Sequence, residues 1–270
     1  MPFYQKRGII PDKRHIQMRN KSGILYSEEL VSRNGFSGIY SNLYHINPPS
    51  AIQKIGDLKK LKLSKVFKTH KPTHLKTNNI DFNEDLFNNR IPLFFNNDLT
   101  ISKTHIKKSS EKLYRNGYAD ELYFLQSGSG VFKSNLGQLD LIPGDYLIIP
   151  RGTIYQIEVT KKMKTLVIES SSSIETPDRY RNKFGQLLEH SPFSERDIKT
   201  PTLSEPILSK SVEVNVKLKS SIQTYVYCNH PFDVVGWDGY FYPYVFNIHD
   251  FMPITGKIHQ PPPVHQTFKG

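Results

Sequence analysis

The sequence lacks the features that mark a secreted or membrane-embedded chain. Cys228 is its only cysteine, which excludes a disulfide framework within the chain. No apolar stretch approaches the length of a membrane-spanning helix. The N-terminal residues MPFYQKRGII contain no apolar run of the kind that makes a secretory signal. Together these absences favour a soluble, cytoplasmic protein without a membrane partner.

Acidic residues are also scarce relative to basic ones. Asp and Glu number 25 against 36 Lys and Arg, so the formal net charge is +11 and the isoelectric point is about 9.5. Such a charge suits a nucleic-acid ligand. However, the lysines are spread along the chain, and no basic run alternates with aromatic side chains as a stacking platform. A solvated basic surface is therefore favoured, and no nucleic-acid partner is expected. The positive electrostatic field of such a surface would also attract a small acidic substrate.

What the chain does contain is a dense run of short strands between Asp120 and Tyr155. Apolar β-formers are interrupted by glycines, then by the turn signals Pro143-Gly144-Asp145 and Pro150-Arg151-Gly152. Proline presets one backbone dihedral and glycine tolerates positive φ, so each of these points favours a tight turn. This rhythm of strand and turn predicts a small antiparallel barrel or jelly roll.

The turn-rich run resembles the cupin barrels. Its segment GDYLIIPRG, residues 144–152, is similar to the second cupin half-motif, and residues 117–121 are similar to the first. Metal-binding cupins carry a His-x-His pair and a Glu in the first half-motif and a further His in the second. The resemblance therefore directs attention to the residues that stand at those positions here.

Tyrosine and aspartate stand where the cupin pattern has histidines. Tyr118 and Asp120 hold the His-x-His positions, and Tyr155 holds the later His position. Glu121 remains, but one carboxylate cannot hold a catalytic iron alone. This first barrel is therefore expected to be metal-free.

Three further blocks resemble the homogentisate 1,2-dioxygenases of the bacterial branch. The first is distributed over the N-terminal region as KRHIQMR, ILYSEEL, NGFSGIYSNLYH and NPPS. The second is PFDVVGWDGYFYPYVFNI, and the third is HQPPPVHQTF near the end. The resemblance implies a mainly β fold, a cupin-like jelly-roll barrel with an extended N-terminal arm, followed by an incomplete second barrel. Residues 1–200 would form the arm and the metal-free barrel, and residues 201–270 would begin the second, catalytic barrel.

The same resemblance implies an activity. Family members use Fe(II) and O2 to open the ring of homogentisate, giving maleylacetoacetate in tyrosine and phenylalanine catabolism, and they assemble as trimers and hexamers. Two His and one carboxylate hold the iron and leave positions open for substrate and oxygen. A separate base removes a substrate proton. Matching the third block to the family pattern places that base, the proton acceptor, on His259, with His265 as the fallback.

The iron ligands of the family lie downstream of the third block. None of the ten His here forms a His-x-His pair, and the neighbours His249 and Asp250 are not expected to start an iron site. The cofactor Fe(II) is therefore expected for the full-length family, with ligands that are not present in this chain, and the chain is interpreted as an N-terminal fragment.

Two other functions compete with the dioxygenase. The first is a non-catalytic cupin-like binding or scaffold protein that has lost its metal half, and the second is a basic nucleic-acid binder supported by charge alone. His259 and His265 also have a structural alternative, in which both cap strands. His45 is expected to be a structural hydrogen-bonding residue, and the sole tryptophan, Trp237, an anchor in the core.

Overall fold

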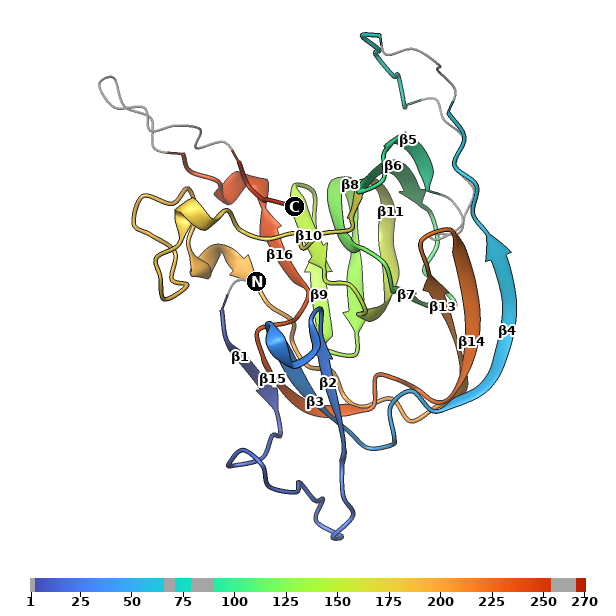
Figure 1. Cartoon of the computed structure of the whole chain (residues 1–270), viewed down its shortest axis with the longest axis vertical. Helices are drawn as coiled ribbons and strands as arrows, with labels where there is room; N and C mark the ends of the chain where they lie inside the picture. Colours follow the sequence, from blue (N-terminus) through green and yellow to red (C-terminus); the bar gives the residue numbers. More distant parts are fainter. Residues whose placement is uncertain (1–2, 66–70, 79–89, 254–265) are drawn as a thin grey trace.

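The computed structural model describes residues 3–65, 71–78, 90–253 and 266–270, and it is built almost entirely of β-strands (Figure 1). Within these residues the strands form two sheets. A four-stranded sheet has the order β1-β15-β3-β2, and its strands are β1 (Gln5–Gly8), β2 (Ser27–Ser32), β3 (Tyr40–His45) and β15 (Val234–Gly239). We call it the arm sheet, because three of its strands come from the N-terminal arm.

The larger sheet has twelve strands within the described residues and a jelly-roll-like course. Its main path is β12-β16-β10-β8-β11-β7-β13-β14-β4, while β6 pairs with β11 and β5, and β9 pairs with β8. These strands are β4 (Ile52–Lys60), β5 (Ile91–Phe95), β6 (Leu99–Ile106), β7 (Leu113–Asn116), β8 (Asp120–Ser134), β9 (Gly137–Leu141), β10 (Asp145–Ile149), β11 (Ile154–Ser170), β12 (Ile198–Lys199), β13 (Lys210–Lys217), β14 (Ser221–Asn229) and β16 (Tyr244–Asn247). Short 3-10 turns complete the described part: η1 (Gly35–Ser37), η2 (Asp178–Tyr180), η3 (Glu195–Asp197) and η4 (Ile248–Asp250).

The alternation of side chains along β8 separates two apolar cores. Tyr123 and Leu125 point into the core enclosed by the jelly roll. Leu122 and Phe124 point to the opposite face and join the core beneath the arm sheet. Because successive strand residues face opposite sides, one strand serves both cores. Trp237 belongs to the second core, is fully buried, and donates its indole N–H to the carbonyl of Leu136 at 2.8 Å, so its expected role as an anchor is confirmed.

The turns predicted at Gly137, at Pro143-Gly144-Asp145 and at Pro150-Arg151-Gly152 are confirmed, and Gly144 has a φ of 89°. The turn expected at the earlier glycines is wrong, because β8 continues through Gly128 and Gly130 as one strand. β8 pairs antiparallel with β9, β10 and β11. The fold is therefore mainly β, with the extended N-terminal arm that the sequence predicted. No helix in the described ranges is long and apolar enough to cross a lipid bilayer.

Strands from both sides of the boundary expected near residue 200 share the two sheets. β13 pairs parallel with β7, β14 pairs with β4, and β16 pairs with β10. β15 lies between β1 and β3 in the arm sheet. The described strands after residue 200 thus complete the sheets begun before it, and the division into two domains at that point stays a prediction.

Candidate functional site

Two carboxylates meet inside the jelly roll at the position where the cupin resemblance directs attention. The register of β8 with β11 places Glu121 directly opposite Glu169. Both residues are buried, with 0% and 5% of their surface exposed. Two neighbouring carboxylates repel each other and lose hydration when buried, so a fold that keeps both ionised must supply cations beside them.

The first cation is Arg90, which lies just before β5. Its Nη1 donates to Glu121 Oε1 at 2.5 Å and to Glu169 Oε1 at 3.0 Å. Its guanidinium carbon lies 5.2 Å from the ring centre of Tyr114 and 5.3 Å from that of Tyr123. A single guanidinium thus bridges both acids and rests against two aromatic rings, a geometry that a planar fork of donors suits better than an ammonium group.

Lys217 and Asn116 complete the pairing. Lys217 Nζ lies 2.5 Å from Glu169 Oε1. Asn116 Nδ2 donates to Glu121 Oε1 at 3.1 Å and to Glu169 Oε1 at 2.9 Å. The two cations balance the two carboxylates, so the site is neutral as a whole and its acidic oxygens accept several hydrogen bonds, as a buried ion pair requires.

Two tyrosines extend the network. Tyr155 Oη donates to Glu121 Oε2 at 2.6 Å and lies 2.9 Å from Tyr123 Oη, which in turn accepts from Arg90. Because the Tyr155 proton is committed to Glu121, Tyr123 donates to Tyr155. We call these seven residues the buried ion cluster: Arg90, Asn116, Glu121, Tyr123, Tyr155, Glu169 and Lys217.

The ionisation states within the buried ion cluster follow from burial and from these charges. Burial acts to raise the pKa of Glu169, but Arg90 and Lys217 outweigh it and hold that pKa below its usual range. Burial acts to lower the pKa of Arg90, but the charge of Glu121 outweighs it and the pKa is raised. Burial is also the main cause that raises the pKa of Tyr123 and Tyr155. Glu169 is therefore charged and the two phenols are protonated near neutral pH.

These residues do not fit a metal ion. Arg90 occupies the space between the two carboxylates, and a divalent cation would have to displace the guanidinium while Lys217 stayed nearby. Across the described ranges there is no group of three or more His, Cys, Asp or Glu side chains placed to hold a metal. The guanidinium thus holds the place that the cupin pattern gives to a metal.

The residues predicted at the cupin histidine positions do not all face this interior. Tyr155 does, through its bond to Glu121. Asp120 was wrongly assigned there: it points to the other face of β8, where it accepts hydrogen bonds from the backbone N–H of Arg151 and of Ile174 and pairs with Arg33. Strand alternation explains the difference, because Asp120 precedes inward-facing Glu121 by one residue.

A cavity of about 410 Å³ opens at the mouth of the jelly roll above the buried ion cluster. Tyr118, the third residue at a cupin histidine position, lines this cavity and therefore lies at the entrance to the jelly roll. The Lys219 ammonium lies 5.6 Å from the Tyr118 ring centre. Arg90, Glu169 and Lys217 form part of the cavity wall, which places the cluster within reach of the solvent side.

The predicted proton acceptor His259 and its fallback His265 lie outside the described residues. The residues on either side of that segment are described, and both flanks pack on one aromatic group. Phe251 lies 6.3 Å from Phe193 between ring centres, and Phe268 lies 6.4 Å from Phe246. Phe193 and Phe246 are themselves 4.7 Å apart. The two ends of the segment are therefore held close to one another.

His45, expected to be structural, is confirmed as a buried hydrogen-bonding residue. Its Nδ1 lies 2.6 Å from Asp233 and its Nε2 lies 3.2 Å from Glu29. Burial acts to lower the pKa of His45, but the hydrogen bonds and charges of Asp233 and Glu29 outweigh it and raise the pKa to about 9. An imidazolium held between two carboxylates joins β3 to β2 and to the residue before β15.

This arrangement predicts a loss of stability at alkaline pH. A histidine whose pKa rises on folding stabilises fully below its unfolded value of about 6.5, and the contribution disappears as pH rises through the folded value. The free energy of unfolding is expected to fall by about 3 kcal/mol between about pH 6.5 and above pH 9. Urea unfolding across this range measures it. The variant His45→Gln, which cannot titrate, is the control, and an equal decline in that variant would contradict the assignment.

The fold and the buried ion cluster define a jelly-roll β protein in which a guanidinium bridges two buried carboxylates. A family model described as homogentisate 1,2-dioxygenase N-terminal matches residues 40–248. The chain belongs to this family of dioxygenases.

Individual relatives agree with the family. A protein of Saccharolobus solfataricus, provisionally named a dioxygenase, is 41% identical over 273 residues, a match that covers 99% of this chain and 70% of that protein. A homogentisate 1,2-dioxygenase of Nitrobacter hamburgensis is 27% identical over 143 residues, covering 52% of this chain and 31% of the enzyme. The matched part thus spans less than a third of that enzyme.

Solved structures share local β architecture with the chain. A cupin-2 domain protein of Shewanella frigidimarina is 17% identical, with a TM-score of 0.29, and covers 33% of this chain and 84% of its own. The Cnp3 cupin domain of Schizosaccharomyces pombe is 13% identical, with a TM-score of 0.32, and the match covers 35% of this chain and 70% of that domain. These TM-scores are low, and nothing about function follows from them.

Proposed function

We propose that this chain is part of a homogentisate 1,2-dioxygenase, which uses Fe(II) and O2 to convert homogentisate to maleylacetoacetate in tyrosine and phenylalanine breakdown. The match of residues 40–248 to the family's N-terminal model is the observation that carries this proposal. The 41% identity to a provisionally named dioxygenase over nearly the whole chain supports the same reaction class.

Within such an enzyme, the jelly roll described here has a supporting role. Its interior acids are neutralised by Arg90 and Lys217, and its described residues do not fit an iron ion. We propose that the two His and the carboxylate that hold iron lie outside the described residues, in the second barrel that residues 201–270 would begin. A cytoplasmic enzyme assembled as a trimer or hexamer is the form that the family resemblance implies.

We further propose His259 as the proton acceptor for the substrate hydroxyl. An imidazole suits this role because its pKa lies near neutrality. On the described flanks of this segment, Met252 donates its backbone N–H to Pro192 at 2.7 Å and Lys269 exchanges backbone hydrogen bonds with Glu175 at 2.7 and 2.8 Å. These contacts fix the points at which the segment leaves and rejoins the fold.

Oxygen uptake tests the proposed function directly. The protein encoded by the complete reading frame, loaded with Fe(II), is expected to consume one O2 for each homogentisate and to form maleylacetoacetate. With 4-hydroxyphenylacetate, which lacks the second ring hydroxyl, no uptake is expected. Absence of uptake with homogentisate from an iron-loaded, folded protein would contradict the proposal and favour the non-catalytic binding or scaffold protein, which the charge-paired interior of the jelly roll also suits.

A further inference from the structure

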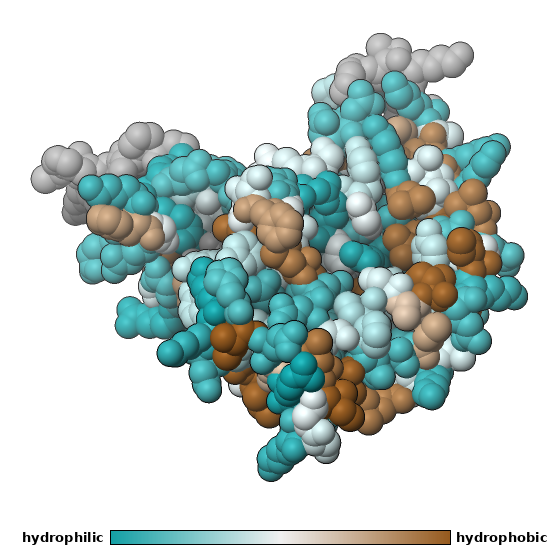
Figure 2. Space-filling model, turned by 60° about the horizontal axis from the view of Figure 1, so that its bottom comes forward, coloured by the Kyte–Doolittle hydropathy of each residue, from teal (hydrophilic) through white to brown (hydrophobic). Residues whose placement is uncertain are grey.

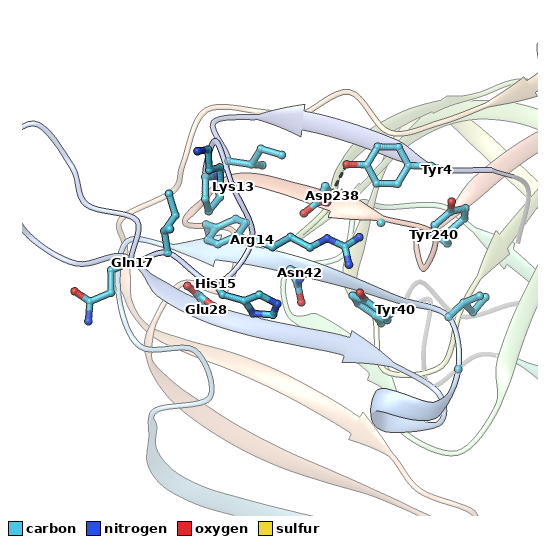
Figure 3. Close-up of a pocket in the computed structure, with 17 residues that line it drawn as sticks. Tyr4, Lys13, Arg14, His15, Gln17, Glu28, Tyr40, Asn42, Asp238 and Tyr240 are labelled. Atoms are coloured by element: carbon cyan, nitrogen blue, oxygen red, sulfur yellow. Dashed lines mark hydrogen bonds between the residues drawn. The ribbon is translucent and has the colours of Figure 1, made fainter.

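A cavity outside the jelly roll lies on the outer face of the arm sheet. Its volume is about 570 Å³, within the usual range for small-molecule sites. Figure 3 shows its floor on β3 and β15 and its cover in the loop that follows β1. No residue of the buried ion cluster is among its described lining residues.

Strand alternation builds the floor. Tyr40, Asn42 and Tyr44 on β3 share one face. Asp238 on β15 and Tyr240 just after it lie beside them, with Asp238 paired to Asn42 in the register. The intervening residues face the core. The outer face of this sheet therefore presents phenol rings, an amide and a carboxylate together. A sheet face that only meets solvent does not require this combination of side chains.

The arm is fixed close to this floor. Ile9 donates its backbone N–H to Val235 at 2.9 Å, and a Cβ built on Gly236 would lie 2.0 Å from the Ile9 carbonyl oxygen. Only glycine permits this approach at position 236. Further along, His15 adopts a φ of 63°, an uncommon value for a residue with a side chain. The turn at His15 follows directly on Arg14, which Figure 3 shows reaching back over the sheet.

The Arg14 guanidinium lies in the cavity without a hydrogen-bond or ion-pair partner among the described residues. Figure 3 shows its guanidinium in the middle of the cavity, between Tyr4 and Asp238 on one side and Tyr40 and Asn42 on the other. Among the described residues that line the cavity, the hydrogen bond marked is the one from Tyr4 Oη to Asp238 Oδ2, at 2.9 Å. No hydrogen bond or ion pair to Arg14 accompanies it within the described part of the chain. The carboxylates of Glu28 and Asp238 also line the cavity, but neither forms an ion pair with Arg14 in the described part of the chain. The guanidinium fork, set among aromatic rings, is therefore open to a carboxylate that is joined to a ring.

We propose that this cavity binds a small hydroxyaryl carboxylate without transforming it. Arg14 pairs with the carboxylate, the ligand ring lies against Tyr4 and Tyr240, whose ring centres are 5.6 Å apart, and Asp238 or Asn42 accepts a hydrogen bond from the ring hydroxyl. The ligand class is set by these residues. That homogentisate itself belongs to the class rests on the proposed function, and the cavity would then be a second, non-catalytic site for substrate-like acids.

The surface around the cavity favours a small ligand over a protein partner. Figure 2, which brings this end of the molecule forward, shows brown apolar patches separated by hydrophilic side chains. Exposed apolar residues of the arm, such as Ile9 and Ile16, are scattered among charged ones. Stable protein interfaces need a continuous desolvated centre, which this pattern does not provide.

Calorimetric titration of the 270-residue chain with 4-hydroxyphenylacetate tests the proposal. One molecule is expected to bind per chain, and Arg14→Met is expected to weaken binding at least about tenfold, as the loss of a charge-assisted pair does. The exposed Arg196, outside the cavity, supplies the matched control, Arg196→Met, which is expected to bind like the parent. The neutral amide 4-hydroxyphenylacetamide is expected to bind as weakly to the parent as the acid does to Arg14→Met.

Three results would overturn this site. They are unchanged affinity in Arg14→Met, equal affinity for acid and amide, and a change of oligomeric state in Arg14→Met by light scattering, which would assign the cavity to a second copy of the chain. A second variant, Tyr240→Leu, removes a ring that would contact the ligand but keeps the Arg14 charge. It is also expected to weaken binding, so the conclusion does not depend on Arg14→Met alone. Oxygen uptake by the complete protein without binding here would contradict this site alone, whereas binding without oxygen uptake would contradict the dioxygenase alone.

Discussion

Replacing Arg90 with methionine is expected to lower the free energy of unfolding by about 3–5 kcal/mol, the range found when one partner of a buried ion pair is removed. The side chain of Arg90 is 7% exposed, and Glu121, which it contacts, is 0% exposed. Methionine fills part of the space but leaves two buried carboxylates with Lys217 as their one remaining cation. The excess negative charge is largely shielded from bulk water and must be neutralised by protonation or by local opening.

Urea unfolding of Arg90→Met measures this loss, with Arg196→Met as the matched surface control. The double variant Arg90→Met/Glu121→Gln is expected to recover part of the stability, because the pair Lys217–Glu169 is then balanced. A loss below about 1 kcal/mol in the single variant, typical of an exposed ion pair, would show that the buried ion cluster is not held by Arg90.

Replacing His259 with glutamine is expected to reduce kcat of the complete, iron-loaded protein by about 10²- to 10⁴-fold, the contribution of a positioned general base. Glutamine keeps a polar side chain of similar length but cannot accept the proton. The prediction rests on the proposed function. If His259 acts mainly in the transition state, kcat and kcat/KM fall by similar factors while KM changes little.

The matched control is His265→Gln, six residues further along the same segment. Its effect on kcat is expected to be small. The reverse order of effects would transfer the role of proton acceptor to His265, and equal small effects would support the alternative in which both histidines are structural. Steady-state oxygen uptake over a range of homogentisate concentrations separates these outcomes.

Much of the fold was accessible from local sequence signals. Val212, Val214 and Val216 alternate with polar residues, a pattern typical of a strand with one exposed face, and they lie in β13. The Pro-Gly-Asp and Pro-Arg-Gly signals predict the turns before and after β10. The apolar runs at residues 93–95 and 99–101 are typical of a hairpin, and they lie in β5 and β6, which pair antiparallel. These features are encoded within a few residues, where periodicity and turn chemistry are sufficient.

The candidate site depended on information that local patterns do not carry. Arg90 follows an Asn-rich stretch whose composition is typical of a surface loop, yet its side chain is buried beside Glu121. The pairing of Glu121 with Glu169 joins residues 48 positions apart and follows from the register of β8 and β11. The signal that was available was indirect: an inward-facing Glu121 without histidines requires a cation from elsewhere in the chain.

The wrong assignment of Asp120 has the same origin. A cupin half-motif fixes spacing, but a shift of one residue on a strand moves a side chain to the other face. Asp120 binds the backbone N–H groups of Arg151 and Ile174, whereas Glu121 faces Arg90. The resemblance located the correct strand, and the register decided which acid points inward.

The most direct test of the guanidinium in the metal position is the metal content of the 270-residue chain. After incubation with Fe(II) and removal of the excess by dialysis, elemental analysis is expected to find far less than one metal ion per chain, and Glu121→Gln is expected to leave that value unchanged. One metal ion per folded chain, lost in Glu121→Gln, would contradict the account, because it would place a metal where Arg90 bridges the two carboxylates.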